Sequence, residues 1–230
     1  MTSFSKPTDF ARSSFAAQRE HMVREQLAGR GLRDARVLAT MGSVPRHEFV
    51  PEPLRQDAYQ DHPLPIGENQ TISQPYIVAA MLEHLALRPT DRVLEVGTGS
   101  GYVTALLSVL SAEVFSIERH ASLAASAAAT LQRLGHRNVN IKVGDGSLGW
   151  PKYSPFDAVL VSAATAEIPS PLFDQLAESG RLIIPVGSPT SQELQLIHKL
   201  NGQQKVTLLE GCRFVPLVEG PAGERSGEGG

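Results

Sequence analysis

A glycine-rich segment that follows a short apolar run constrains the fold of this chain more than any other feature. The apolar run, Arg92–Val96, predicts a buried strand. Three glycines come next, Gly97, Gly99 and Gly101, and residues 101–111 carry leucines at helical spacing. A strand, a glycine loop and a helix in this order are typical of Rossmann-type folds, because glycines let the backbone approach a ligand at the helix N-terminus.

Apolar strands and amphipathic helices alternate after this unit. The predicted strands are residues 113–118, 139–143, 156–161 and 181–186, and the predicted helices are residues 121–134 and 171–178. Such alternation indicates an α/β fold with a mostly parallel sheet and helices on both faces. Two later runs, residues 194–200 and 205–209, flank Asn201-Gly202, a strong hairpin signal. We therefore expect an antiparallel C-terminal edge on the sheet.

The N-terminal third carries mostly helix and loop signals. Apolar residues recur at helical spacing over residues 14–29, and Asp34 is placed to cap a short helix. Residues 73–87 predict a further helix with Pro75 in its first turn, where the missing N–H costs little. We expect a helical N-terminal extension to the α/β core.

Composition and charge disfavour several classes of protein. The 230 residues carry a formal net charge of −3 and no long basic tract, so we expect no nucleic-acid partner. The single cysteine, Cys212, cannot form a disulfide within the chain, and no apolar run is long enough for a membrane span. These features favour a cytoplasmic protein without a membrane partner. The seven histidines show no metal-ligand spacing, so we expect no bound metal. We also expect the protein to be a monomer.

Spacing and charge at the glycine loop separate two classes of ligand. Gly101 falls four positions after Gly97 rather than five, so the dinucleotide pattern G-x-G-x-x-G is not met. Glu95 lies two residues before the loop, where a carboxylate would repel a pyrophosphate and favour a ligand with an ammonium and a sulfonium. The alternative for Glu95 is a side chain that points to solvent or caps a turn. The apolar neighbours Leu94 and Val96 argue against it.

Acidic residues also end the next two predicted strands. Glu118 stands 21 residues after Gly97, where an acid accepts hydrogen bonds from ribose hydroxyls. Asp145 follows the third strand and is placed to accept from an adenine amino group, while Gly146 lets the ring come close. Taken alone, Glu118 is better explained as a solvated strand end and Asp145 as part of an ordinary Asp-Gly turn. Three acids at successive strand ends together predict one rim of a nucleoside site.

A segment just upstream of the glycine loop, Gln70-Thr71-Ile72-Ser73-Gln74-Pro75-Tyr76, closely resembles the protein-L-isoaspartate O-methyltransferase family. Further matches follow in family order over roughly residues 19–219: Val44-Pro45-Arg46, Leu64-Pro65-Ile66-Gly67, Ser116-Ile117-Glu118-Arg119, Gly144-Asp145-Gly146 and Arg213-Phe214-Val215-Pro216-Leu217. The first string is highly specific, whereas many methyltransferases share the glycine loop.

The resemblance implies a Rossmann-like methyltransferase fold with S-adenosyl-L-methionine as the methyl donor, released as S-adenosyl-L-homocysteine. It implies that the acceptor is the free α-carboxylate of L-isoaspartyl residues in damaged proteins and peptides. The resulting ester collapses to a succinimide, whose hydrolysis regenerates some normal aspartate. This carboxyl methylation thus begins protein repair.

The resemblance also assigns roles to individual residues. Ser73 matches the catalytic, substrate-contacting serine, and Val215 matches a position that touches the substrate backbone. Thr71 and Ile72 match residues that line the cofactor site, and Tyr76 matches a cofactor-side contact. The glycine loop with Thr98 is expected to hold the cofactor as well. Spacing alone would make Ser73 a helix cap ahead of the proline, and the two roles can coexist.

The domain organisation follows from these assignments. We expect a single methyltransferase domain over residues 14–219, divided into a helical N-terminal part, residues 14–90, and a cofactor-binding α/β core, residues 91–219. Residues 1–13 are expected to form a mobile arm and residues 220–230 a disordered tail.

Two departures from the family pattern bear on the site. Asn69 stands where a glycine is common, and asparagine tolerates a left-handed backbone, so the turn is expected to survive. Thr165-Ala166 replaces an Ala-Pro-like step in a loop expected to border the substrate.

The chemistry needs no general base, because a carboxylate is already an ionised nucleophile at neutral pH. Three alternatives stay open: a small-molecule S-adenosylmethionine-dependent methyltransferase, an NAD-dependent oxidoreductase, which the glycine spacing and Glu95 disfavour, and a non-catalytic cofactor-binding protein.

Overall fold

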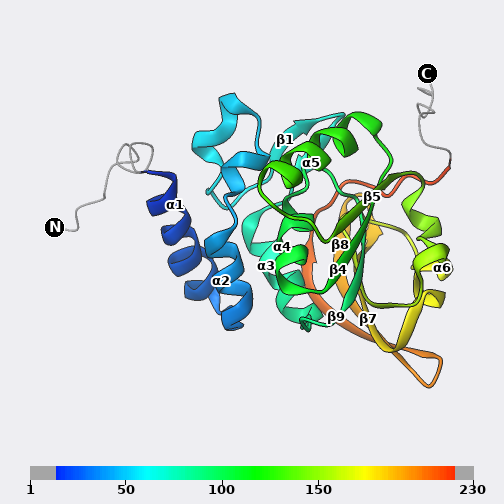
Figure 1. The fold of residues 1–230 in the computed structure, drawn as a ribbon. Helices are drawn as coiled ribbons and strands as arrows, with labels where there is room; N and C mark the ends of the chain where they lie inside the picture. Colours follow the sequence, from blue (N-terminus) through cyan, green and yellow to red (C-terminus); the bar gives the residue numbers. More distant parts are fainter. Residues whose placement is uncertain (1–13, 221–230) are drawn as a thin grey trace.

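A seven-stranded sheet organises the chain in the computed structural model, which describes residues 14–220 (Figure 1). Its strands are β3 (Arg92–Val96), β4 (Glu113–Glu118), β5 (Val139–Val143), β6 (Phe156–Val161), β7 (Leu176–Ser188), β8 (Ser191–Leu200) and β9 (Gln203–Cys212). They lie in the order β5-β4-β3-β6-β7-β8-β9. The pairs from β5 to β7 are parallel, and β8 and β9 add antiparallel strands. The predicted fold class is confirmed.

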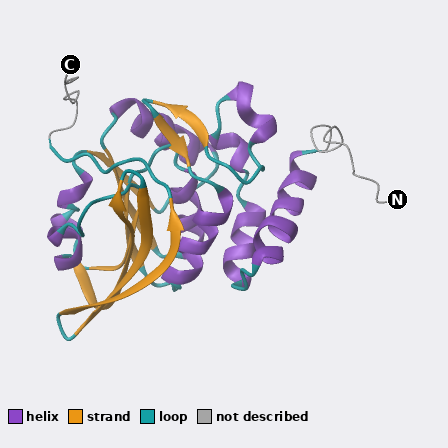
Figure 2. Cartoon of the chain, turned by 180° about the vertical axis from the view of Figure 1, so that it is seen from behind, coloured by secondary structure: helices purple, strands orange, loops and turns teal. Residues whose placement is uncertain are grey.

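Helices cover both faces of this sheet (Figures 1 and 2). Helices α3 (Pro75–Leu85), α4 (Tyr102–Leu110) and α5 (Ala121–Arg133) pack on one face. The short helix α6 (Ser170–Asp174) and the 3₁₀ turns η6 (Gly146–Leu148) and η7 (Pro151–Tyr153) lie on the other. Successive strand residues alternate between the two cores: Val93 joins the first hydrophobic cluster and Leu94 the second. Both faces are therefore buried, which explains the continuous apolar runs in the sequence.

The antiparallel edge turns where the sequence indicates. Asn201 and Gly202 have φ angles of 53° and 72°, and Leu200 pairs with Gln203 across this two-residue turn. Asn-Gly favours such a turn because both residues adopt positive φ at low cost. Helix α6 is shorter than predicted: Leu176 already pairs with Phe156, so the chain enters β7 there.

The expectation of a helical N-terminal part is wrong at one place. Strands β1 (Leu64–Gly67) and β2 (Gln70–Ile72) form a two-stranded antiparallel sheet, with Leu64 opposite Ile72 and both side chains buried. The turn between them places Glu68 and Asn69 at φ angles of 51° and 55°. The left-handed backbone expected of Asn69 is confirmed. The signature string thus lies on a hairpin that leads into α3.

The interpretation of Ser73 as a helix cap is also wrong. Helix α3 starts at Pro75 with Gln74 as its N-cap residue, and the Gln74 side chain makes no capping hydrogen bond. By contrast, the Asp34 carboxylate accepts hydrogen bonds from the backbone N–H groups of Arg36 and Val37, as predicted for a helix cap. Ser73 is therefore free of a capping role.

The remaining N-terminal elements are α1 (Phe15–His21), the π-helical η2 (Met22–Leu27), the 3₁₀ turns η3 (Ala28–Arg30), η4 (Arg46–Phe49) and η5 (Glu52–Asp57), and α2 (Ala35–Ser43). One hydrophobic cluster contains Met22 and Met41 from this part together with Val93 and Ile183 from the sheet. A shared core supports our proposal that residues 14–219 form one domain.

The expected arm at residues 1–13 lies outside the described residues, as does the expected tail beyond Gly220. Between residues 14 and 220, no helix is long and apolar enough to cross a membrane.

Candidate active site

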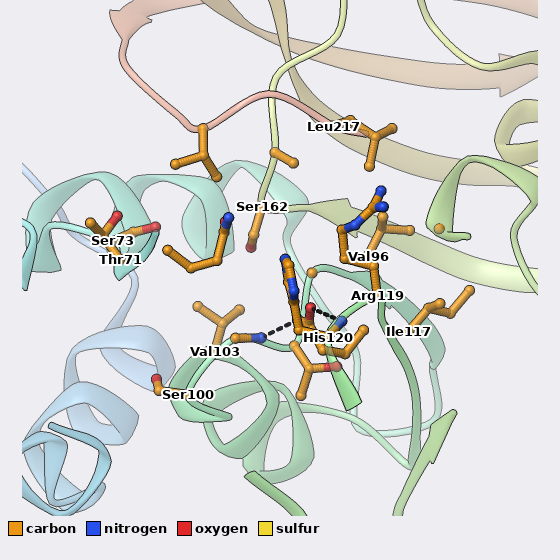
Figure 3. A pocket seen from close by; sticks show the side chains of 18 of the residues that line it. Thr71, Ser73, Val96, Ser100, Val103, Ile117, Arg119, His120, Ser162 and Leu217 are labelled. Atoms are coloured by element: carbon orange, nitrogen blue, oxygen red, sulfur yellow. Dashed lines mark hydrogen bonds between the residues drawn. The ribbon is translucent and has the colours of Figure 1, made fainter. Parts of the chain in front are cut away.

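A cavity opens at the carboxyl ends of the central strands. Strand β3 pairs with β4 on one side and with β6 on the other, so chain connections leave it in both directions. Ligands of open α/β sheets bind at such a switch point. This first cavity has a volume of about 90 Å³. Figure 3 shows Thr71 and Ser73 at one end of it and Ile117 and Arg119 at the other.

The predicted residues that line this cavity are Thr71, Ile72, Ser73, Gly97, Thr98, Gly99, Glu118, Gly146 and Val215. They come from the hairpin strand β2, the glycine loop, the ends of β4 and β5, and the segment after β9. The structure thus brings together residues that lie far apart in the sequence.

The glycine loop lies directly against its neighbours. At Gly99, with φ of 54°, a Cβ atom would stand 3.3 Å from the Ile66 side chain. At Gly101, with φ of 87°, it would stand 3.1 Å from the Ala127 Cβ. Gly101 does not line the cavity; it is the N-cap residue of α4, so its expected contact with the ligand is replaced by a structural role.

Glu118 is held in a fixed orientation at the end of β4. Its Oε2 accepts a hydrogen bond from the Gly99 N–H at 2.8 Å, and its Oε1 accepts one from the His120 N–H at 3.0 Å. A carboxylate has about four acceptor positions, so two stay available to a ligand. Glu118 lines the cavity and is 5% exposed. This arrangement suits a pair of vicinal hydroxyl groups.

Glu95 does not face the cavity, and that expectation is wrong. Strand alternation places its side chain beneath α4, where it is 0% exposed. Its Oε2 accepts hydrogen bonds from the Thr104 hydroxyl at 2.5 Å and the Ser116 hydroxyl at 2.6 Å. Burial raises the pKa of Glu95 to about 8. The carboxyl is therefore mostly neutral at pH 7, and it reaches the loop only through Ser116, which bonds to Thr98 Oγ1 at 2.5 Å.

Asp145 stands at the edge of the site. Its Oδ1 accepts from the Ser147 N–H at 2.9 Å and the Ser147 hydroxyl at 2.7 Å, and its Oδ2 accepts from the Gly220 N–H at 2.8 Å. Asp145 is not among the lining residues, whereas Gly146 is. A Cβ atom on Gly146 would lie 2.3 Å from Val96 Cγ1, so close packing on β3 also requires a glycine there.

A buried arginine fixes the backbone of Ser73. Arg46 donates from Nη2 to the Ser73 carbonyl and from Nε to the Ala58 carbonyl, both at 2.7 Å. Its guanidinium also lies 4.8 Å from the centre of the Tyr102 ring. Burial lowers the pKa of Arg46 to about 10, so it stays protonated at neutral pH. Arg46 was not predicted as a site residue, although it lies in the Val44-Pro45-Arg46 string.

A second, larger cavity of about 770 Å³ adjoins the first. The two share Thr71, Ser73, Ser162 and Val215 in their walls. Tyr76 lines the second cavity and not the first, so its expected cofactor-side contact is not what the structure shows. Its backbone N–H donates to Asp61 Oδ1, which anchors the start of α3. The site is thus two compartments that meet at Ser73.

Several lining residues escaped the sequence analysis. Ser162 directly follows β6, and Arg119 and His120 directly follow Glu118. The rule that predicted the acidic residues could have found them too, because residues just past the ends of parallel strands gather at one edge of the sheet. The wall near Val215 is held by the Ala164 N–H, which donates to the Val215 carbonyl at 2.8 Å. Over residues 14–220, no group of three His, Cys, Asp or Glu side chains could hold a metal ion.

Proteins similar to this chain are named for methyl transfer to isoaspartate. A family model of protein-L-isoaspartate(D-aspartate) O-methyltransferases matches residues 17–222. Protein-L-isoaspartate O-methyltransferase 1 of Syntrophobacter fumaroxidans is 54% identical over 205 residues, which cover 89% of this chain and 96% of that protein. The protein-L-isoaspartate O-methyltransferase of Koribacter versatilis is 54% identical over 206 residues, covering 90% of this chain and 93% of that protein.

A solved structure from Plasmodium falciparum shows the same fold. It is described as a protein-L-isoaspartate O-methyltransferase in complex with S-adenosyl-L-homocysteine. It matches with a TM-score of 0.78 at 29% identity and covers 90% of this chain and 99% of that one.

Proposed function

The chain belongs to the protein-L-isoaspartate(D-aspartate) O-methyltransferase family, and we propose that it methylates the free α-carboxylate of L-isoaspartyl residues in damaged proteins and peptides. The methyl donor is S-adenosyl-L-methionine, and the ester then enters repair through a succinimide. The observation that carries this proposal is the junction at Ser73, where the cavity at the strand ends meets a larger one. A larger second compartment suits a peptide better than a small-molecule acceptor.

The residues of the first cavity fit the cofactor. S-adenosyl-L-methionine supplies a methyl group on a positively charged sulfur. Glu118 has acceptor positions for the ribose hydroxyls, and the small Gly146 leaves room for the adenine ring. Thr71, Ile72, Gly97, Thr98 and Gly99 also line the proposed site.

Three predicted cofactor residues do not line the first cavity and instead support the residues that do. Gly101 allows α4 to start, and Glu95 supports Thr98 through Ser116. Asp145 stabilises the turn that carries Gly146. Its expected hydrogen bond to the adenine amino group stays a prediction.

Transfer breaks the carbon–sulfur bond as a carboxylate oxygen forms the new carbon–oxygen bond. The site must align the three atoms and exclude water rather than remove a proton. In our proposal the Ser73 hydroxyl donates to one carboxylate oxygen and leaves the other free to attack. Arg46 holds the Ser73 backbone at the junction, and Val215 lies against the substrate.

Both cavities are formed by one chain, so we propose that a monomer is able to bind both substrates and transfer the methyl group. The cytoplasmic location stays a prediction.

The test is methyl transfer from labelled S-adenosyl-L-methionine to matched peptides that differ only in an isoaspartyl or an aspartyl residue. The proposal expects base-labile label in the isoaspartyl peptide alone. Equal label in both peptides, or in neither, would contradict it. If neither peptide is labelled, a small-molecule methyl acceptor explains the site better.

A further inference from the structure

Two arginines line the second cavity away from the junction. Arg30 and Arg213 contribute to the second cavity but not to the first, whereas Ser73 and Val215 contribute to both. If the methyl group crosses at the junction, the arginines face parts of the substrate beyond the reacting residue. They therefore belong to recognition of the flanking peptide.

Arg213 is an unpaired cation. Its side chain is exposed, and no hydrogen bond or ion pair joins it to another residue in the described part of the chain. Of the described residues in this wall, Glu210 alone carries a carboxylate, and its Oε2 lies 3.6 Å from His84 Nε2. Arg213 thus has its full charge available to a ligand.

Arg30 is a partly paired but well-oriented cation. Its Nη1 lies 2.5 Å from Asp61 Oδ2, and its guanidinium stacks 3.6 Å from the centre of the Tyr76 ring. Asp61 is itself fixed, because it accepts hydrogen bonds from Gln74 Nε2 and the Tyr76 N–H. An arginine has five N–H donors, so the N–H groups of Arg30 that do not bond to Asp61 can donate to a planar carboxylate.

The arginines are unsuited to hold the reacting carboxylate itself. Methylation neutralises that group, so a guanidinium bound to it would stabilise the substrate more than the transition state and occupy the lone pairs that attack. A carboxylate that keeps its charge throughout the reaction is the better partner.

We propose that Arg213, assisted by Arg30, selects isoaspartyl sites that have acidic side chains next to them. The inference rests on the proposed function, and it names the class of substrate that the site prefers. It makes Arg213 a specificity-determining residue and gives it no part in the chemical step.

The experiment uses three peptides that differ only in the residues on both sides of the isoaspartyl residue: glutamate, glutamine or lysine. For the wild-type chain, kcat/KM should fall from glutamate to glutamine to lysine by about two- to fivefold per step at low salt. The difference should lie in KM and shrink as salt rises, because the arginines are exposed.

Variants separate charge selection from a structural effect. Arg213→Gln should level the three peptides, and Arg213→Glu should place lysine first, an inversion that misfolding cannot produce. Arg30→Gln should weaken the preference. Arg137→Gln is the matched control, since Arg137 is exposed and lies outside both cavities; it should keep the wild-type order.

Equal kcat/KM for the three peptides, or an order unchanged by Arg213→Glu, overturns the inference and leaves the proposed function intact. A complete absence of methylation with every peptide overturns both.

Discussion

Replacing Gly146 by alanine tests how the adenine end of the first cavity is built. A Cβ atom at this position would stand 2.3 Å from Val96 Cγ1, far inside van der Waals contact. Val96 is 1% exposed at the carboxyl end of β3 and packs within the second hydrophobic cluster, so it has little room to move aside. Since Gly146 does not have a positive φ, the penalty is purely steric. Either the strand or the loop that lines the cavity must shift.

The size of the effect follows from this clash. Overpacking a buried site by one methyl group costs about 1–3 kcal/mol. For a domain of this size each kcal/mol corresponds to roughly 2–4 °C in Tm, so the expected fall is about 2–12 °C. Because the loop forms one wall of the cofactor site, we expect binding of S-adenosyl-L-homocysteine to weaken by about tenfold or more, a change of roughly 1.4 kcal/mol.

Gly144→Ala is the matched control on the same segment. Its Cβ atom would meet only the end of the Lys142 side chain, at 3.9 Å, so stability and binding should stay at wild-type values. Thermal unfolding and titration calorimetry with S-adenosyl-L-homocysteine give both quantities. If Gly146→Ala behaves like Gly144→Ala in both assays, the reasoning about packing on β3 is refuted.

Three further predictions concern the junction and the buried acid. Ser73→Ala should lower kcat on an isoaspartyl peptide by about 10- to 150-fold, because it removes one hydrogen bond to a charged group. The affinity for S-adenosyl-L-homocysteine should stay unchanged. An unchanged kcat would refute the proposed role of Ser73. In Arg46→Lys, the lysine cannot donate to both the Ser73 and Ala58 carbonyls, so the free energy of unfolding in urea should fall by about 1–3 kcal/mol. The variant should also lose more in kcat than in cofactor affinity. Wild-type stability would count against this role of Arg46. For Glu95, burial raises the pKa from 4.5 in the unfolded chain to about 8, so the stability contributed by its proton is complete below pH 4.5 and is lost as pH rises through 8. Glu95→Gln resembles the protonated acid and should gain stability relative to wild type from pH 5 to 8; a pH-independent difference contradicts this.

The central strands of the sheet were predictable because they are buried on both faces. Strands β3, β4 and β6 begin and end at the predicted residues, since buried and mostly apolar runs leave little freedom in their bounds. The bounds of the more exposed strand β5 also match the prediction. The hairpin β1–β2 was not predicted. Its strands are short, one contains Pro65, and the turn at Glu68-Asn69 lacks the usual glycine.

At the site, the limit was the position of each side chain along its strand. Glu118 and Glu95 both lie at or near strand ends close to the glycine loop, and both were expected to face the ligand. They lie on the same face of the sheet, because Glu95 pairs with Ser116, two residues before Glu118. Glu118 is the last residue of β4 and reaches the cavity, whereas Glu95 lies deeper, beneath α4. The register between β3 and β4 decides this depth, so spacing in the sequence alone could not make the distinction.

The second cavity could not be predicted because it is a product of tertiary packing. Arg30, Tyr76 and Arg213 come from three separate parts of the chain and meet only when the N-terminal helices and the segment after β9 pack beside α3. No local pattern in the sequence contains that contact.

The central claim is that the two cavities meet at Ser73 and that methyl transfer takes place there. The most direct test is a crystal structure with S-adenosyl-L-homocysteine and an isoaspartyl peptide bound together. We expect the nucleoside in the first cavity, the peptide in the second, and the free α-carboxylate within hydrogen-bond distance of Ser73 Oγ and facing the sulfur atom. A peptide bound elsewhere, or a carboxylate that faces away from the sulfur, would contradict the account.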